Sequence, residues 1–202
     1  MKLSKITLLL AFVALTSITF AQKIVKVEGD LSFLASSPSI NIEYDYSEMG
    51  VGKFKTEEEY VNKKVEEYNA DEAGRGDKWK ESWIGSRERV YHPKFEELFN
   101  KYAEKAGVSG ARNQADAKYT LIVKTTFTEP GFNIGITSKP ASVNFEYSFV
   151  ETATKKVVAK FVQEKVPGAQ AMGMDFDTST RISESYAKAG KMFGGYISKN
   201  LK

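Results

Sequence analysis

The chain contains no cysteine, and this absence excludes several classes of protein at once. A disulfide framework, a thiol nucleophile and a cysteine-based metal site are all ruled out, so packing has to hold the fold together. No lipobox cysteine follows the N-terminal leader described below, so we expect no acylated anchor. No sequence motif for a metal ion or cofactor is present, and we expect the protein to use neither.

The sequence has a single histidine, His92, and any Ser-His-Asp site would need it as its base. No G-x-S-x-G elbow supplies a partner serine. His92 directly precedes Pro93, where a side chain tends to cap a helix or face solvent. We therefore favour a structural or solvated role for His92 over a catalytic one.

Long apolar runs are also scarce, and the one present lies at the N-terminus. Lys2 and Lys5 precede an apolar run of about 15 residues, shorter than the roughly 20 needed to span a bilayer. Thr19-Phe20-Ala21 then places small residues at the positions expected before a cleavage site. We predict a signal peptide over residues 1–21 and a single α+β domain over residues 22–202. This domain would be exported, periplasmic or extracellular, without a lipid anchor or membrane span.

Basic charge is low once this leader is set aside. The net charge is +3, and the leader contributes two lysines, so the remainder carries about +1. Nucleic-acid binding needs a concentrated basic face. We therefore expect no nucleic-acid partner.

The N-terminal half predicts strands followed by helices. Residues 23–34 are apolar enough for a strand or two, and residues 39–47 alternate strictly between apolar and polar. Thr56 and Glu59 form a capping-box pattern, further helices are expected from Lys78 and from Pro93, and the chain should break at His92-Pro93. Trp79 and Trp83, one helical turn apart, could bind a sugar or a cationic group, although core anchoring is the favoured interpretation.

The C-terminal half changes to the period of strands. Residues 118–127, 143–150 and 157–166 predict an antiparallel meander, and residues 179–200 a long closing helix. Gly190 and Gly194 in that helix predict a close backbone approach to the sheet or to another helix. The fold class is therefore α+β, with a mixed or antiparallel sheet of about 4-5 strands covered by helices.

Two connections are unusually apolar, and they form the predicted partner-binding surface. The first, residues 128–141, is long for a hairpin loop and could instead extend its strands into a protruding hairpin. The second, residues 167–176, carries flexible methionines suited to adaptable contacts. The alternative is that both segments fold over the ends of the core. The candidate partner-binding residues are Phe132, Ile134, Ile136, Met172, Met174 and Phe176.

Acidic residues suggest two further chemistries. Asp175 and Asp177 resemble the start of a calcium loop, but the glycine and glutamate that an EF-hand requires are missing, so helix capping is favoured. Glu43, Asp45 and Glu146 are candidates for a carboxylate pair acting on glycans. Alternating acidic residues usually mark only the solvated face of a strand.

The C-terminal half resembles a group of small α/β domains. The residues that carry the resemblance are ADAKYTLIVK from Ala115, VNFEYSFVETATKKVVA from Val143, and the closing helix. Similar domains occur in lipopolysaccharide-transport and curli-secretion lipoproteins and at the N-terminus of the Tol-system propeller protein. The resemblance implies an envelope assembly fold and no catalytic residues.

Two functional hypotheses follow from the sequence. The favoured one is an exported, non-catalytic binding or assembly module of the bacterial envelope, which holds a protein, peptide or lipid partner at a sheet edge or at the two apolar loops. The alternative is a carboxylate-dependent hydrolase acting on envelope glycans.

Overall fold

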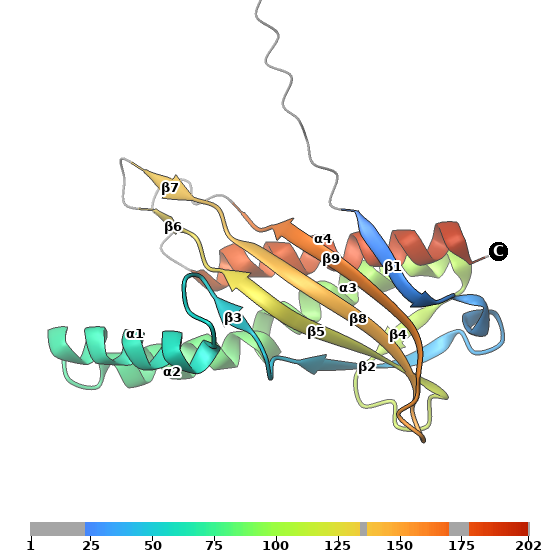
Figure 1. Cartoon of the computed structure of the whole chain (residues 1–202), viewed down its shortest axis with the longest axis horizontal. Coiled ribbons are helices and arrows are strands. Elements are labelled where there is room, and N and C mark those ends of the chain that lie inside the picture. The colour runs from blue at the N-terminus through green and yellow to red at the C-terminus, as the bar shows by residue number, and fades with distance from the viewer. Residues whose placement is uncertain (1–22, 134–136, 170–177, 202) are drawn as a thin grey trace, which may run out of the picture.

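The computed structural model describes residues 23–133, 137–169 and 178–201. They build a mixed sheet with helices packed on one of its faces, the α+β class predicted from the sequence (Figure 1). The sheet contains β1 (Ile24–Gly29), β2 (Ser39–Asp45), β3 (Gly50–Val51), β4 (Ser109–Ala111), β5 (Tyr119–Glu129), β8 (Ser142–Glu151) and β9 (Val157–Pro167). The α-helices are α1 (Glu57–Asp71), α2 (Arg75–Ser86), α3 (His92–Ala103) and α4 (Thr178–Asn200). No helix within these ranges is both long and apolar enough to cross a membrane.

The predicted meander forms the middle of the sheet. The strand order of the sheet is β1-β9-β8-β5-β2-β4, and the pairs β1-β9, β9-β8 and β8-β5 are antiparallel. β2 runs parallel to both β5 and β4, and β3 pairs with β5 beyond the end of β2. The described sheet has seven strands, whereas about 4-5 were predicted. The prediction was low because β3 and β4 are too short to show an alternation of apolar and polar residues.

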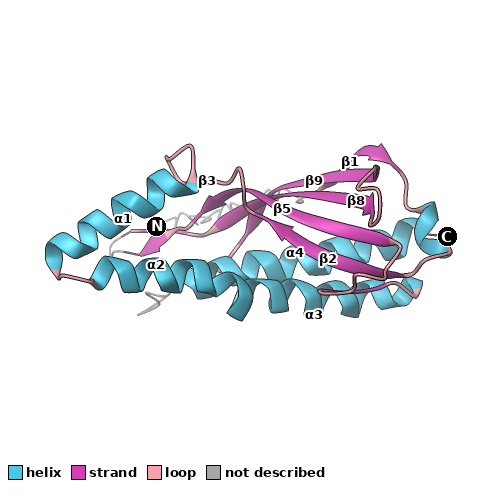
Figure 2. Cartoon of the chain, turned by 90° about the horizontal axis from the view of Figure 1, so that it is seen from below, coloured by secondary structure: helices cyan, strands magenta, loops and turns pink. Residues whose placement is uncertain are grey.

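The core lies between the sheet and the helices α3 and α4, which Figure 2 shows beneath one face of the sheet. Alternate positions of β8 and β9 point into this layer, as their period of two requires. There Phe193 of α4 stacks on Tyr147 of β8 with ring centroids 4.0 Å apart. The fully buried aromatic residues of this layer are Phe95, Phe99, Phe145, Tyr147, Phe149, Phe161, Tyr186 and Phe193.

Helices α3 and α4 run parallel and almost in backbone contact. A Cβ atom built on Gly190 would lie 2.2 Å from the carbonyl oxygen of Phe95, and one on Gly194 would lie 2.4 Å from that of Phe99. One further turn along, the hydroxyl of Ser198 donates to the carbonyl oxygen of Tyr102. This confirms the close approach predicted from the glycine spacing and identifies α3 as the neighbour.

The chain does not break at His92-Pro93, and here the prediction is wrong. Helix α2 continues through a π-helical turn (Arg87–Tyr91) directly into α3. Pro93 sits in the first turn of α3, where its missing N–H is not needed. The wide turn redirects the chain without interrupting its helical character.

Helices α1 and α2 form a hairpin that projects beyond the end of the sheet (Figure 2). The hydroxyl oxygen of Thr56 accepts from the backbone N–H of Glu59 at 3.2 Å, which confirms the predicted cap of α1. Trp79 and Trp83 stack with centroids 5.6 Å apart and both contact Tyr60 of α1. The tryptophans therefore anchor the hairpin, as the favoured interpretation held.

One further expectation needs correction at the N-terminal end. Only Ile24–Gly29 of residues 23–34 is a strand, and Ser32–Ala35 forms a 3₁₀ turn. Leu34 on that turn is fully buried, so the turn packs against the core through this side chain. Asp175 and Asp177 lie outside the described residues.

Candidate functional site: a polar groove at an open sheet edge

The edge of β2 is only partly covered by a neighbouring strand. β4 pairs with Ser39–Asn41, after which the chain turns away at Arg112, and within the described residues no other strand pairs on that side of β2. A groove of about 740 Å³, the edge groove, follows this open stretch. Its lining comes from β2, from the helical run between Ile84 and His92, from the loop between Arg112 and Ala115, and from Thr152 and Lys155.

Hydrogen bonds from two asparagine side chains to the backbone hold β4 and the loop that follows it in place. The amide of Asn100 on α3 donates to the carbonyl oxygen of Gly110 and accepts from its N–H, both at 2.8 Å. The buried Asn41 on β2 accepts from the backbone N–H of Gln114 at 3.0 Å. Together these bonds occupy the outer side of β4 and hold the departing loop aside. The second half of β2 is therefore left without a strand partner.

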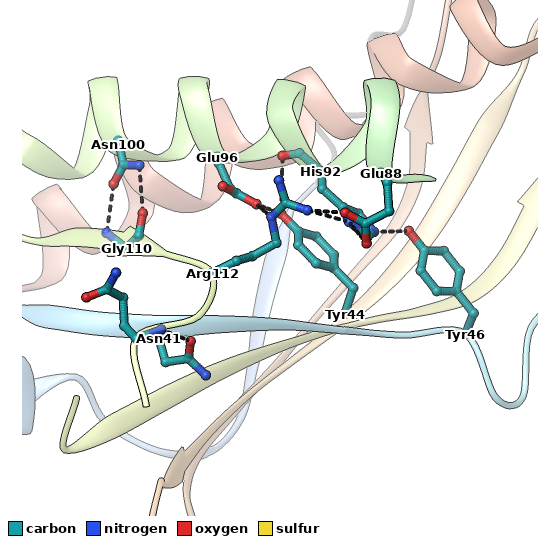
Figure 3. A network of polar contacts seen from close by, with 10 residues as sticks. Asn41, Tyr44, Tyr46, Glu88, His92, Glu96, Asn100, Gly110 and Arg112 are labelled. Atoms are coloured by element: carbon teal, nitrogen blue, oxygen red, sulfur yellow. Dashed lines mark hydrogen bonds and ion pairs between the residues drawn. The ribbon is translucent and has the colours of Figure 1, made fainter. Parts of the chain in front are cut away.

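One wall of the edge groove is a stack of rings around His92. The imidazole lies flat on the ring of Tyr44, with centroids 3.6 Å apart and 6° between the planes (Figure 3). Its Nε2 atom lies 3.0 Å from the hydroxyl of Tyr46, and its Nδ1 atom lies 3.1 Å from the carboxylate of Glu88. Because a carboxylate only accepts, Nδ1 carries the proton and Nε2 accepts from Tyr46.

Arg112 ties this wall to the loop that leaves β4. Its Nε lies 2.7 Å from the carboxylate of Glu96, and its terminal nitrogen pairs with Glu88 (Figure 3). Glu96 also accepts from the hydroxyl of Tyr44 at 3.2 Å. Glu88, His92 and Glu96 are spaced by four residues and therefore lie on one helical face.

Burial sets the protonation states in this wall. Only 4% of the His92 surface is exposed, and this burial lowers its pKa to about 4, with Arg112 and Arg87 adding to the effect and Glu88 opposing it. Burial likewise raises the pKa of Glu96, although Arg112 and the Tyr44 hydroxyl act in the other direction. The pKa of the Tyr46 phenol is raised mainly by burial. At neutral pH the imidazole is therefore uncharged.

The opposite wall belongs to the outer face of the sheet. Glu43 on β2 lies 3.6 Å from the amine of Lys155, and its carboxylate accepts from the Asn41 amide at 3.1 Å. Because the lining includes both Glu43 and Tyr44, which point to opposite faces of β2, the groove wraps around the strand edge.

The carboxylates that the sequence suggested for hydrolysis are not brought together as a pair. Glu43 faces Lys155, Asp45 lies 3.8 Å from Lys124, and Glu146 lies 2.8 Å from Lys160. Burial opposes ionisation of Asp45, yet the hydrogen bonds from Ser47 and the charge of Lys124 hold its pKa below the usual range. The geometry thus gives the hydrolase alternative no support. No cluster of metal-ligating side chains occurs within the described part of the chain.

Of the six predicted partner-binding residues, the structure describes Phe132. It lies on β6 (Phe132–Asn133), which pairs with β7 (Ser138–Lys139), and 42% of its surface is exposed. The protruding hairpin considered from the sequence is thus present. Ile134, Ile136, Met172, Met174 and Phe176 lie outside the described residues.

The stems of the two apolar connections meet at one end of the sheet. The N–H of Gly168, after β9, donates to the carbonyl oxygen of Ala141, before β8, at 2.8 Å. The guanidinium of Arg181 reaches the carbonyl oxygen of Pro130 from α4. The two predicted loops therefore leave the core beside each other.

The edge groove itself could not be predicted from the sequence. His92 is buried under Tyr44 instead of capping a helix or facing solvent, because the π-helical turn rotates it toward β2. The spacing of Glu88, His92 and Glu96 was visible in the sequence, but the loop that brings Arg112 onto that face was not.

Comparisons with known proteins place the chain in no family. No family profile and no curated protein matches it. Among solved structures, PelC from Paraburkholderia phytofirmans aligns over 89% of this chain and 98% of its own, with a TM-score of 0.39 and 12% identity. A DUF330 protein from Xanthomonas campestris aligns over 54% and 61%, with a TM-score of 0.36 and 12% identity.

A third structure is a putative neuraminyllactose-binding hemagglutinin homolog from Helicobacter pylori, which covers 87% of this chain and 88% of its own. Its TM-score is 0.31 and its identity 13%. Similarities at this level transfer neither a ligand nor an activity to this chain.

Proposed function

We propose that this chain is an exported, non-catalytic binding module of the bacterial cell envelope that holds an extended segment of a protein partner at the open edge of β2. The observation that carries the proposal is the edge groove, a polar channel beside a strand whose neighbour stops at Ala111. An unpaired strand edge offers backbone donors and acceptors to an incoming strand.

The walls of the edge groove suit such a partner strand. Side chains of an added strand alternate between the two faces of the sheet. Those on one face would meet Tyr44, His92 and Arg112, and those on the other would meet Glu43 and Lys155. The stretch Ile42–Asp45 leaves room for about four residues of partner strand at roughly 3.3 Å per residue.

A binding role also fits the state of the polar side chains. Glu88, Glu96, His92 and Arg112 are engaged with one another, and Tyr44 and Tyr46 complete their hydrogen bonds. Networks of ion pairs and hydrogen bonds rigidify a surface and define its shape. We infer that they shape the groove wall for recognition.

Photo-crosslinking in the producing bacterium tests the proposal. A photoreactive phenylalanine analogue replaces Ala115, which lines the edge groove, or Ala70, an exposed position on α1 that serves as the control. We expect a discrete adduct from position 115 and none from position 70. The partner peptide in the adduct is then mapped by mass spectrometry and synthesised.

The synthetic peptide provides the second step. Ile84 lines the edge groove and is 40% exposed, and Val157 on β9 is 39% exposed away from it. We expect Ile84→Glu to weaken peptide binding by about tenfold or more and Val157→Glu to leave it unchanged. Similar adducts from both crosslinker positions, no adduct at all, or equal affinity for the two glutamate variants would refute the proposal.

The two apolar loops remain a second proposed surface for the same function, favoured by the exposure of Phe132 and by the adjacent loop stems. Deletion of Gly131–Ser138 separates the two surfaces. If the crosslinked peptide still binds the deletion variant, the edge groove alone holds it. If binding is lost there and retained in Ile84→Glu, the loops hold the partner instead.

A further inference from the structure

In Figure 1, β1 and the C-terminal end of α4 lie at the same end of the molecule. Residues of these two elements line a second groove, of about 780 Å³. We call it the lysine groove. It is formed between the start of β1, the end of α3 and the last turns of α4. Ser198 of α4 donates to the carbonyl oxygen of Tyr102 and thereby fixes the two helices at its base. Its volume is typical of small-molecule sites, which measure roughly 300–1,000 Å³.

The rim of the lysine groove is basic. Lys23, Lys105, Lys191 and Lys199 line it, and no acidic residue does. In the described part of the chain, no ion pair involves any of these lysines. Helix C-termini attract cations, which accounts for Lys105 and Lys199. Lys191 lies in the middle of α4 and Lys23 precedes β1, so their position here has no such explanation.

The floor of the lysine groove is apolar. Ile24 is buried, and Tyr102, Met192 and Tyr196 are half-buried beneath the lysines. The amines of Lys105 and Lys191 lie 6.0 and 5.4 Å from the ring centre of Tyr102. Gly195 adds open space, because the nearest atom to a Cβ built there is a ring carbon of Tyr102 at 4.0 Å.

We infer that the lysine groove binds a long-chain anionic amphiphile, with its carboxylate among the lysines and its aliphatic chain along the floor. The positive charge of the lysines at the rim attracts an anion. The apolar floor favours a ligand with an aliphatic chain, since burial of apolar surface is favourable by roughly 25 cal/mol per Å². A nucleic acid or a free inorganic anion would leave the floor unused. This site is separate from the edge groove and does not depend on it.

The test uses oleate and a fluorescent fatty acid, 11-(dansylamino)undecanoate, with the purified protein. We expect the probe to bind one site per chain and oleate to displace it. Oleyl alcohol, which has the same chain without the charge, should displace it at least about tenfold less well. The double variant Lys191→Glu/Lys199→Glu should weaken binding by about tenfold or more, whereas Lys78→Glu/Lys80→Glu on α2 makes the same charge change elsewhere and should have no effect.

A blocking variant distinguishes loss of the site from loss of the fold. Gly195→Leu places an apolar side chain in the open space of the floor and replaces glycine with a better helix former. We expect probe binding to be lost while the melting temperature is not lowered. Unchanged binding in this variant, equal displacement by oleyl alcohol, or no binding by wild-type protein would overturn the inference. Binding to phosphatidylglycerol vesicles that Gly195→Leu leaves intact would show that the lysines contact a membrane surface and would also overturn it.

Discussion

Two adjacent glycines of α4 should respond in opposite directions to the same substitution. At Gly194 an added Cβ would lie 2.4 Å from the carbonyl oxygen of Phe99 and 3.0 Å from the backbone nitrogen of Ala103. At Gly195 the added Cβ meets only the Tyr102 ring, 4.0 Å away. Comfortable non-bonded contacts lie near 3.5–4.0 Å, so Gly194→Ala requires α3 and α4 to separate by about 1 Å.

The expected magnitudes follow from two opposing effects. Replacing a helical glycine with alanine stabilises a helix by about 1 kcal/mol. Overpacking typically costs about 1–3 kcal/mol, and the upper end applies at Gly194 because backbone atoms cannot rotate away. We therefore expect Gly194→Ala to lower the free energy of unfolding by about 2 kcal/mol and Gly195→Ala to raise it by up to about 1 kcal/mol.

Urea unfolding followed by far-ultraviolet circular dichroism measures both values. Because both variants make the same change in the unfolded chain, their difference of about 3 kcal/mol reports on the folded state. For a domain of this size, it corresponds to melting temperatures separated by roughly 6–12 °C. If both alanine variants gained stability equally, the close contact between α3 and α4 and the core built on it would be wrong.

Two further predictions concern His92 and the predicted signal peptide. Histidine titrates near 6.5 in an unfolded chain, whereas the pKa of His92 is about 4. The unfolded state therefore binds more protons between these values, so this contribution to stability is complete above pH 6.5 and is lost as the pH falls to 4, by at most about 3 kcal/mol. Urea unfolding at pH 7 and at pH 4.5 measures the free energy of unfolding of each protein. Between these two pH values, this free energy should fall less for His92→Gln than for wild type. Equal decreases would contradict the burial of His92. N-terminal sequencing of protein from the producing cell should begin at Gln22, and a start at Met1 with the protein in the cytosol would disprove export.

Much of the fold could be predicted because it depends on local periodicity. The alternation in β5, β8 and β9, the cap at Thr56 and the apolar stripe of α4 are each contained in a short stretch of sequence. The small strands β3 and β4 could not be foreseen, since pairs of two or three residues carry no period. The π-helical turn before His92 also went unpredicted, because Pro93 locally indicates a break.

The edge groove depends on contacts between residues distant in the sequence. Tyr44 meets His92, and Arg112 meets Glu88 and Glu96, across a sheet edge and a helix. The lysine groove likewise gathers Lys23, Lys105 and Lys191 from three separate parts of the chain. From sequence alone, a charged residue in a helix is predicted to be exposed to solvent. Its neighbours from other elements become known only in the folded structure.

The sequence by itself determined that this chain is thiol-free, where most of its longer strands and helices lie, and that two glycines of its last helix meet another backbone. Those properties follow from residue composition and from spacing within single elements. Only the tertiary structure decided where β4 stops, that His92 is buried and uncharged, and that four lysines surround an apolar floor. The reason is physical: an open strand edge, a pKa and a binding cavity each arise from what other parts of the chain leave covered or exposed.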